Sequence, residues 1–280
     1  MTRQLADGPW DSTLSTGEFA AVAGVGFEPV GQVLGTAVFN LGNTGAWACP
    51  GAWTTAGGPS SPWDPSLAPL AKAVHAARRL AVARAVAECR TLHGDGIVGV
   101  RLTADPFPAG GTEFTAIGTA VRAVQSRIRP RQPFASHLGG QDFARLLHAG
   151  WVPTGLAFGV SLAIRHDDWR ASGLTGRRRF AGNQEVDGHT RLLGHVRREA
   201  RARLALDARR HGGGDGVVGD GVVGDDICLD VRETECPGSG SARDLIAEAV
   251  FVGTSIARFG RSGRPATTGP LTIMRLEREH

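Results

Sequence analysis

The chain has 280 residues, of which 41% are hydrophobic and 21% are charged, with 40 glycines, 15 prolines and four cysteines. This composition is typical of a folded globular protein and excludes an extended disordered chain, and no apolar run is long enough for a transmembrane helix. The formal net charge is +4, and Lys72 is the only lysine, so arginine carries almost all of the positive charge.

The cysteines and the first residues of the chain bear on the cellular compartment. Cys49, Cys89, Cys228 and Cys236 show no CxxC spacing, and the segment at residues 1–11 lacks the apolar core of a signal peptide. We therefore expect a cytoplasmic protein with reduced thiols and no membrane partner.

An internal repeat organises the chain. Pro9–Leu14 matches Pro133–Leu138, and Gly26–Gly35 matches Gly150–Gly159 at the same shift in residue number. Two further blocks recur in the same order, Asp95–Gly99 as Asp215–Gly219 and Ile117–Val121 as Val252–Ile256. Because Asp220–Gly224 repeats the sequence of Asp215–Gly219, the equivalent of Asp95 stays open between Asp215 and Asp220. The repeat predicts a tandem duplication with domains at residues 1–128 and 129–258, followed by a tail at residues 259–280.

Each copy is predicted to contain a strand, a long loop, a helix and two further strands. In the first copy the apolar segment 19–27 predicts a buried strand, and a helix is expected from the N-cap Ser66 to about His93. Its small-residue face consists of Leu70, Val74, Ala77 and Ala81. Strands are expected at 97–103 and 113–124. A Gly/Pro-rich insertion at residues 40–65, which contains Trp47, Trp53 and Trp63, is a candidate interface cover.

The second copy repeats this order, with strands at 143–151, 217–233 and 247–257. Its helix carries Leu193, Val196, Ala200, Leu204 and Ala208 on one face and arginines on the other. In the tail, Leu271–Leu276 is expected to add an edge strand or to contact a neighbouring subunit. The fold class predicted for both copies is α+β, an antiparallel sheet with one long helix packed on it.

The chemical motifs favour no enzyme. Gly94–Gly99 reads GxGxxG, but a helix precedes it and a strand follows, the reverse of a dinucleotide site, so the glycines are expected to form a tight turn with positive φ. No catalytic set of acid, base or nucleophile repeats in both halves. Cys228 and Cys236, with nearby acidic residues, could hold a divalent heavy metal, and the alternative is that these cysteines are buried as small apolar residues.

Basic residues concentrate in the second helix, between Arg191 and Arg210. A solvated helix face is the simpler interpretation, and nucleic-acid or anion binding is the alternative. The histidines at helix positions, His75, His93, His195 and His211, are expected to be caps or exposed residues and not metal ligands.

The repeated motifs resemble those of the YbjQ-like family of heavy-metal-binding domains. The positions that carry the resemblance are Gly26, Gly31, Gly35, Asp95, Gly96, Gly99, Gly118 and Thr119 in the first copy and Gly150, Gly155, Gly159, Asp215, Gly216, Gly219, Gly253 and Thr254 in the second. The resemblance implies a small dodecin-like α+β unit and assembly into rings, typically pentamers. It supplies no metal ligands. We therefore expect a non-catalytic, ring-forming homo-oligomer, with a metal or small ligand held between subunits, or a purely structural scaffold.

Overall fold

The structure, a computed structural model, describes residues 12–41, 67–125, 130, 132–166, 185, 187–210, 220–235, 243–258 and 273–275. The insertion at 40–65 lies almost entirely outside these residues, as do Cys49, Cys236, His211 and the segment that contains Asp215, Gly216 and Gly219. The helices are α1 (Thr16–Gly24), α2 (Ala68–Thr91), α3 (Gly140–His148) and α5 (Asp187–Arg210). The strands are β1 (Phe27–Phe39), β2 (Gly96–Pro106), β3 (Thr112–Ala123), β4 (Phe134–Ala135), β5 (Trp151–His166), β6 (Gly221–Glu235), β7 (Arg243–Arg258) and β8 (Ile273–Arg275).

The strands form two four-stranded sheets with the same pattern. Sheet A has the order β1-β3-β2-β4 and sheet B the order β5-β7-β6-β8. In each sheet the first three strands are antiparallel, and the long edge strand has a register shift just after a proline, at Pro29/Gly31 in β1 and at Pro153/Gly155 in β5. The fourth strands differ, because β4 is parallel to β2 whereas β8 is antiparallel to β6.

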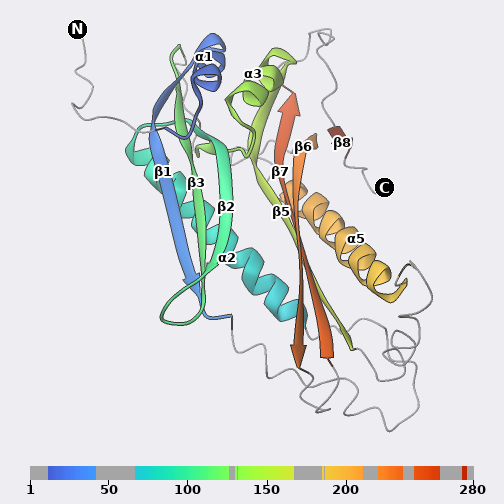
Figure 1. The fold of residues 1–280 in the computed structure, drawn as a ribbon. Helices are drawn as coiled ribbons and strands as arrows, with labels where there is room; N and C mark the ends of the chain where they lie inside the picture. The colour runs from blue at the N-terminus through green and yellow to red at the C-terminus, as the bar shows by residue number, and fades with distance from the viewer. Residues whose placement is uncertain are drawn as a thin grey trace.

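The elements stack in four layers, in the order sheet A, α2, sheet B and α5 (Figure 1). One hydrophobic cluster contains α2 together with residues of β1, β2 and β3 on one side and of β5 and β7 on the other. A second cluster joins α5 to the far face of sheet B. A helix therefore lies on each face of sheet B, as the buried residues all along the middle of β5 show, while the part of β6 that contains Ile227, Leu229 and Val231 is exposed.

Close approach between helix and edge strand depends on a glycine in each half. A Cβ atom at Gly35 would collide with the carbonyl oxygen of Ala81 in α2, and one at Gly159 would collide with that of Ala200 in α5. Ala77 and Ala81, which belong to the small-residue face predicted for α2, are both fully buried. The glycines at these two strand positions thus allow each helix to lie directly on its sheet.

The α+β fold class is confirmed, but the first predicted strand of each half is wrong. Residues 16–24 and 140–148 are the helices α1 and α3, and the strands begin only at Phe27 and Trp151. The helix α1 begins with a capping box, in which Ser15 and Glu18 exchange hydrogen bonds, and its alanines favour the helical state. Gly26 and Gly150 have φ of 80° and 79°, which ends these helices and does not bend a strand.

The predicted long helices are confirmed, with small changes at their ends. The N-cap of α2 is Leu67 and not Ser66, which lies outside the described residues. On α5 the residue buried at the start of the apolar face is Leu192, while Leu193 is only half-buried. Within the described helices, none is both long and apolar enough to cross a membrane.

Candidate functional site

Thr119 and Thr254, which hold equivalent positions in the two halves, anchor the segment that precedes each short helix. Thr119 Oγ1 accepts a hydrogen bond from the Thr13 backbone N–H at 3.1 Å and lies 3.2 Å from Ser12 Oγ. Thr254 Oγ1 makes the same contacts with the His137 N–H at 3.2 Å and with Ser136 Oγ at 3.0 Å. Both threonines are fully buried, and their hydrogen bonds hold the segments that precede α1 and α3.

Asp95 ties the start of β2 to the end of β3. Its backbone N–H donates to the Val121 carbonyl, and its carboxylate accepts from the Ala123 N–H at 2.9 Å. Asp220 does the same in the second half, since its carboxylate accepts from the Arg258 N–H at 3.0 Å. The second-half equivalent of Asp95 is therefore Asp220, which takes the position that the sequence left open between Asp215 and Asp220.

The same assignment extends to the glycines. Gly224 has φ of 60° and stands where Gly99 stands with φ of 65°, each at a register shift between the second and third strands. The sequence alone does not distinguish Asp215 from Asp220, because both repeats of the tandem Asp-Gly-Val-Val-Gly sequence fit the motif equally well. Gly94 and Gly96 do not have positive φ, and the left-handed residue at the end of α2 is His93, with φ of 57°.

Charged helix residues satisfy the backbone of the two edge strands. A carboxylate oxygen of Glu88 accepts from the Leu34 N–H at 2.6 Å, and one of Asp207 accepts from the Phe158 N–H at 2.7 Å. Arg84 likewise donates to the Thr36 carbonyl, as Arg203 donates to the carbonyl of Val160. These pairs occupy hydrogen-bonding groups that an edge strand would otherwise leave open. The sequence analysis did not predict these four hydrogen bonds, because each joins residues far apart in the chain and forms no local motif.

Asp207 also connects the two halves. Besides Phe158, it contacts Arg79 of α2 in an ion pair and lies 3.3 Å from His75 Nε2. The same arginine donates to the Leu156 carbonyl at 2.8 Å and lies 4.5 Å from the centre of the Phe158 ring. Burial lowers the pKa of Arg79, and the carboxylate of Asp207 opposes this shift. His75 thus makes a tertiary contact in the middle of its helix, where a cap or an exposed residue was expected.

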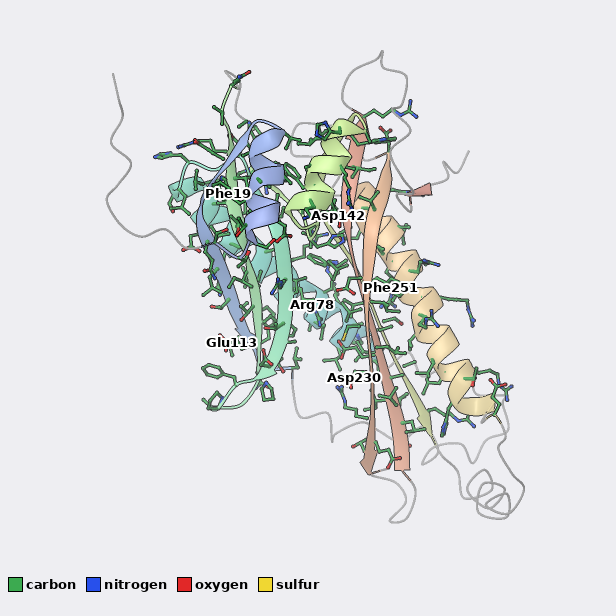
Figure 2. All side chains as sticks on the ribbon, turned by 45° about the horizontal axis from the view of Figure 1, so that its top comes forward. Phe19, Arg78, Glu113, Asp142, Asp230 and Phe251 are labelled. Carbon is green, nitrogen blue, oxygen red and sulfur yellow. The ribbon has the colours of Figure 1, made fainter. Side chains whose placement is uncertain are left out.

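A cleft of about 600 Å³ opens between the two sheets beside the first turns of α2. Its polar lining includes Arg78, Cys228, Asp230, Arg232 and Glu248, and Figure 2 shows Arg78 between the sheets. Arg78 Nη1 lies 3.8 Å from Glu248 Oε1 but makes no hydrogen bond among the described residues. Burial lowers the pKa of this arginine, whereas Glu248 and Cys228 oppose the shift.

The described part of a single chain does not fit a heavy-metal site. No group of three or more His, Cys, Asp or Glu side chains within it could hold a metal ion. Cys89 is fully buried, and burial raises the pKa of its thiol to about 12, so the thiolate needed for ligation is scarce at neutral pH. Cys228 is exposed, and its suggested partner Cys236 lies outside the described residues.

The two sheets differ in how their equivalent faces are covered. The face of sheet B that carries Phe158 and Val160 is buried against α2. The equivalent face of β1 carries Leu34 and Val38, which are 49% and 46% exposed. No described element covers these two side chains of sheet A. This face, formed around Leu34, Val38 and Glu113, is called the open face below.

Comparison with known proteins gives two matches. The family described as "Putative heavy-metal-binding" matches residues 65–124, which span α2, β2 and β3. Over 243 residues the chain is 35% identical to a protein of Mycobacterium tuberculosis (strain ATCC 25618 / H37Rv) named "Encapsulin nanocompartment protein Rv1762c", with 85% of this chain and 86% of that protein covered. No solved structure matches the chain. With this identity over most of both sequences, the chain belongs to the family of the encapsulin nanocompartment protein Rv1762c.

Proposed function

We propose that this protein is a non-catalytic homo-oligomer whose role is to assemble with copies of itself. The observation that carries the proposal is the open face of sheet A, because the equivalent face of sheet B is buried under a helix. Contiguous exposed apolar surface marks protein interfaces, and Leu34 and Val38 lie on the same face of β1. The name of the 35% identical relative, a nanocompartment protein, supports the same function.

The proposal includes the tandem duplication, with domains at 1–128 and 129–258 and a tail from 259. The two sheets share their strand order, and the same helix-to-strand hydrogen bonds recur through Glu88 and Asp207. A chain with two similar domains presents a helix at one end of its layers and an open sheet at the other. Such a chain suits repetition in a ring or shell.

Native mass spectrometry tests the assembly directly. We expect a discrete species whose mass is a whole-number multiple of 29.3 kDa, stable to dilution across the micromolar range. The proposed ring would give one closed stoichiometry, whereas a filament would give a ladder of masses. A monomer at every concentration would overturn the proposal.

A second candidate function is a heavy metal or small ligand held between subunits, favoured by the family description and by the cleft that contains Cys228. Since the described residues of one chain supply no complete metal site, further ligands would have to come from a second chain. Elemental analysis of the assembled protein for zinc, copper and nickel tests this function. We expect loss of the metal in a Cys228→Ser/Cys236→Ser variant, and a metal-free assembly would count against it.

A further inference from the structure

We propose that the outer face of α5 docks on the open face of sheet A in a second copy, so that the chains join head to tail. The outer face of α5 is defined here by Thr190, Gly194, Arg197 and Arg198, which lie on the side of the helix away from the buried Leu192, Val196 and Ala200. The inference rests on the proposed self-assembly and names the surfaces that carry it.

The template for this contact lies inside each chain, where α2 packs on sheet B. Arg79 of α2 pairs with Asp207 and stacks on Phe158, and Arg78 lies 3.8 Å from Glu248 on β7. These contacts join the helix of the first half to the sheet of the second half and to Asp207 on its helix α5. If each half is one copy of the same unit, the same contact can join the helix of the second half to the sheet of a following first half.

The two helices can be aligned through their shared hydrogen bonds. Glu88 and Asp207 cap equivalent strand residues, as do Arg84 and Arg203. In this alignment Arg197 and Arg198 of α5 take the positions of Arg78 and Arg79. The outer face of α5 therefore carries the same two arginines that hold α2 on sheet B, and in the single chain both are exposed.

The open face carries the matching carboxylates. Glu113 precedes Thr119 by the same number of residues by which Glu248 precedes Thr254, so it stands opposite the position of Arg197 in the template. Glu88 takes the place of Asp207 and would face Arg198. Figure 2 shows Glu113 on sheet A and Arg78 between the sheets. Both arginines of the docking helix would thus meet an acid in the second copy, with Leu34 between them.

The short helices supply an independent observation. In the internal contact, Phe143 of α3 is fully buried against the first half, 5.2 Å from the ring centre of Phe27. Phe19 holds the equivalent position on α1 and is 39% exposed. Repeating the internal arrangement would place Phe19 of the second copy on the apolar cluster of the first copy's second half, which contains Trp151 and Ile256. A single docking arrangement would therefore bury both Leu34 and Phe19 of the second copy.

The edges of β2 and β6, unlike the helices and sheet faces, have different partners in the two halves and are not part of the proposed contact. In sheet A the residues Gly96 and Ile97 pair with β4 of the second half, whereas in sheet B the equivalent Gly221 and Val222 pair with β8 of the tail. The proposed contact therefore depends on the helix, the sheet face and Phe19. The surfaces that meet are different on the two copies, which makes the interface heterologous and gives a closed ring only when the rotation closes.

The test exchanges charge across the proposed interface. R197E/R198E reverses the docking helix, and E88R/E113R reverses the open face. R191E is the matched control, because it makes the same change on α5 at a position equivalent to the exposed Lys72 of α2, away from the template contact. We expect each double variant to need a protein concentration on the order of 100-fold higher to assemble, while R191E assembles like the wild type.

A mixture of the two double variants decides the matter. Each carries one reversed and one native surface, so every contact between two unlike variants joins opposite charges. A ring with an even number of chains satisfies all of its contacts and a ring with an odd number all but one, and we expect assembly to return in the mixture and not in either variant alone. Misfolded variants would not complement each other, and far-UV circular dichroism of each checks the fold. A wild-type monomer would overturn the proposed function itself. Three results would overturn the docking surface and leave self-assembly standing, provided that the wild type assembles. The first is an R197E/R198E variant that assembles like the wild type, and the second is a mixture of the double variants that stays dissociated. The third is an R197E/R198E variant that still assembles and has lost only bound nucleic acid.

Discussion

The equivalent faces of the two sheets have the same geometry but different exposure. On β5, Phe158 is fully buried beneath α2, between Arg79 and His75. On β1, Leu34 takes the same place, with its N–H held by a helix carboxylate in the same way, yet its side chain is 49% exposed. The difference teaches that this face of a half is buried where a helix of another unit lies on it, as α2 lies on sheet B.

The largest expected effect comes from truncating the two equivalent side chains. Phe158→Ala should lower the free energy of unfolding by about 3–5 kcal/mol, because it leaves a cavity under α2. Leu34→Ala should lower it by only about 1 kcal/mol in a dissociated chain, since half of its surface is already in water. Urea unfolding in the R197E/R198E background measures both without a contribution from assembly. Equal losses would show that the open face is buried within one chain.

Removing the two equivalent helix carboxylates, Asp207 and Glu88, should lower the free energy of unfolding by different amounts. Asp207→Ala leaves Arg79 without its ion partner in a largely buried site, and we expect a loss of about 3 kcal/mol in the free energy of unfolding. Glu88→Ala removes one exposed hydrogen bond to Leu34, for a loss of about 1 kcal/mol. Thermal unfolding of both variants makes the comparison. Adding Arg79→Met to Asp207→Ala should recover part of the loss, and failure to do so would place the cost elsewhere.

Smaller losses are expected where a glycine allows helix and strand to meet. Gly35→Ala places a methyl group against the Ala81 carbonyl and should cost about 1–3 kcal/mol in unfolding free energy. Gly24→Ala is the matched control, because a Cβ there meets no atom within 4 Å and lies at the end of α1. The control should be neutral or slightly stabilising, and denaturant midpoints compare the two. A neutral Gly35→Ala would contradict the close packing of α2 on sheet A.

The smallest effect concerns pH and the contact between α1 and α3. Hydrogen bonds from the backbone N–H of Ser15, its hydroxyl and the Gly140 N–H lower the pKa of Glu18 below its ordinary value of 4.5, although partial burial opposes the shift. Because the folded pKa is the lower one, this stabilisation is present above pH 4.5 and is lost as the pH falls through the folded pKa. Glu18→Gln should therefore cost about 1 kcal/mol at neutral pH and remove that pH dependence.

Asp142 provides the comparison for Glu18, since it holds the equivalent position on α3 and forms an exposed ion pair with Arg145 one turn away. Asp142→Asn should change the unfolding free energy by less than about 0.5 kcal/mol. Stability curves measured between pH 3 and pH 7, as an approximate range for carboxylate titration, distinguish the two. A similar pH response in both variants would show that Glu18 does not link α1 to α3.

Several features of the fold could be predicted from the sequence because they are local. The buried faces of α2 and α5 follow from the helical spacing of their apolar residues. The internal repeat and its repeated glycine positions predict two similar α+β halves. The error at residues 19–27 has a local cause as well, because a short apolar run does not distinguish strand from helix, and the capping box at Ser15 was overlooked. One missed signal was the apolar stretch from Leu156 to Ile164, which is typical of a strand buried on both faces.

The sequence by itself determined the helices, the strand-forming segments and the glycines that let them pack, since periodicity and conformational preference are properties of neighbouring residues. Only the tertiary structure decided that α2 lies between two sheets, that Asp220 and not Asp215 serves the second half, and that Asp207 reaches Arg79 across the halves. These facts depend on contacts between residues far apart in the chain. The same contacts leave Leu34, Arg197 and Arg198 exposed on the surfaces that we propose join one copy to the next.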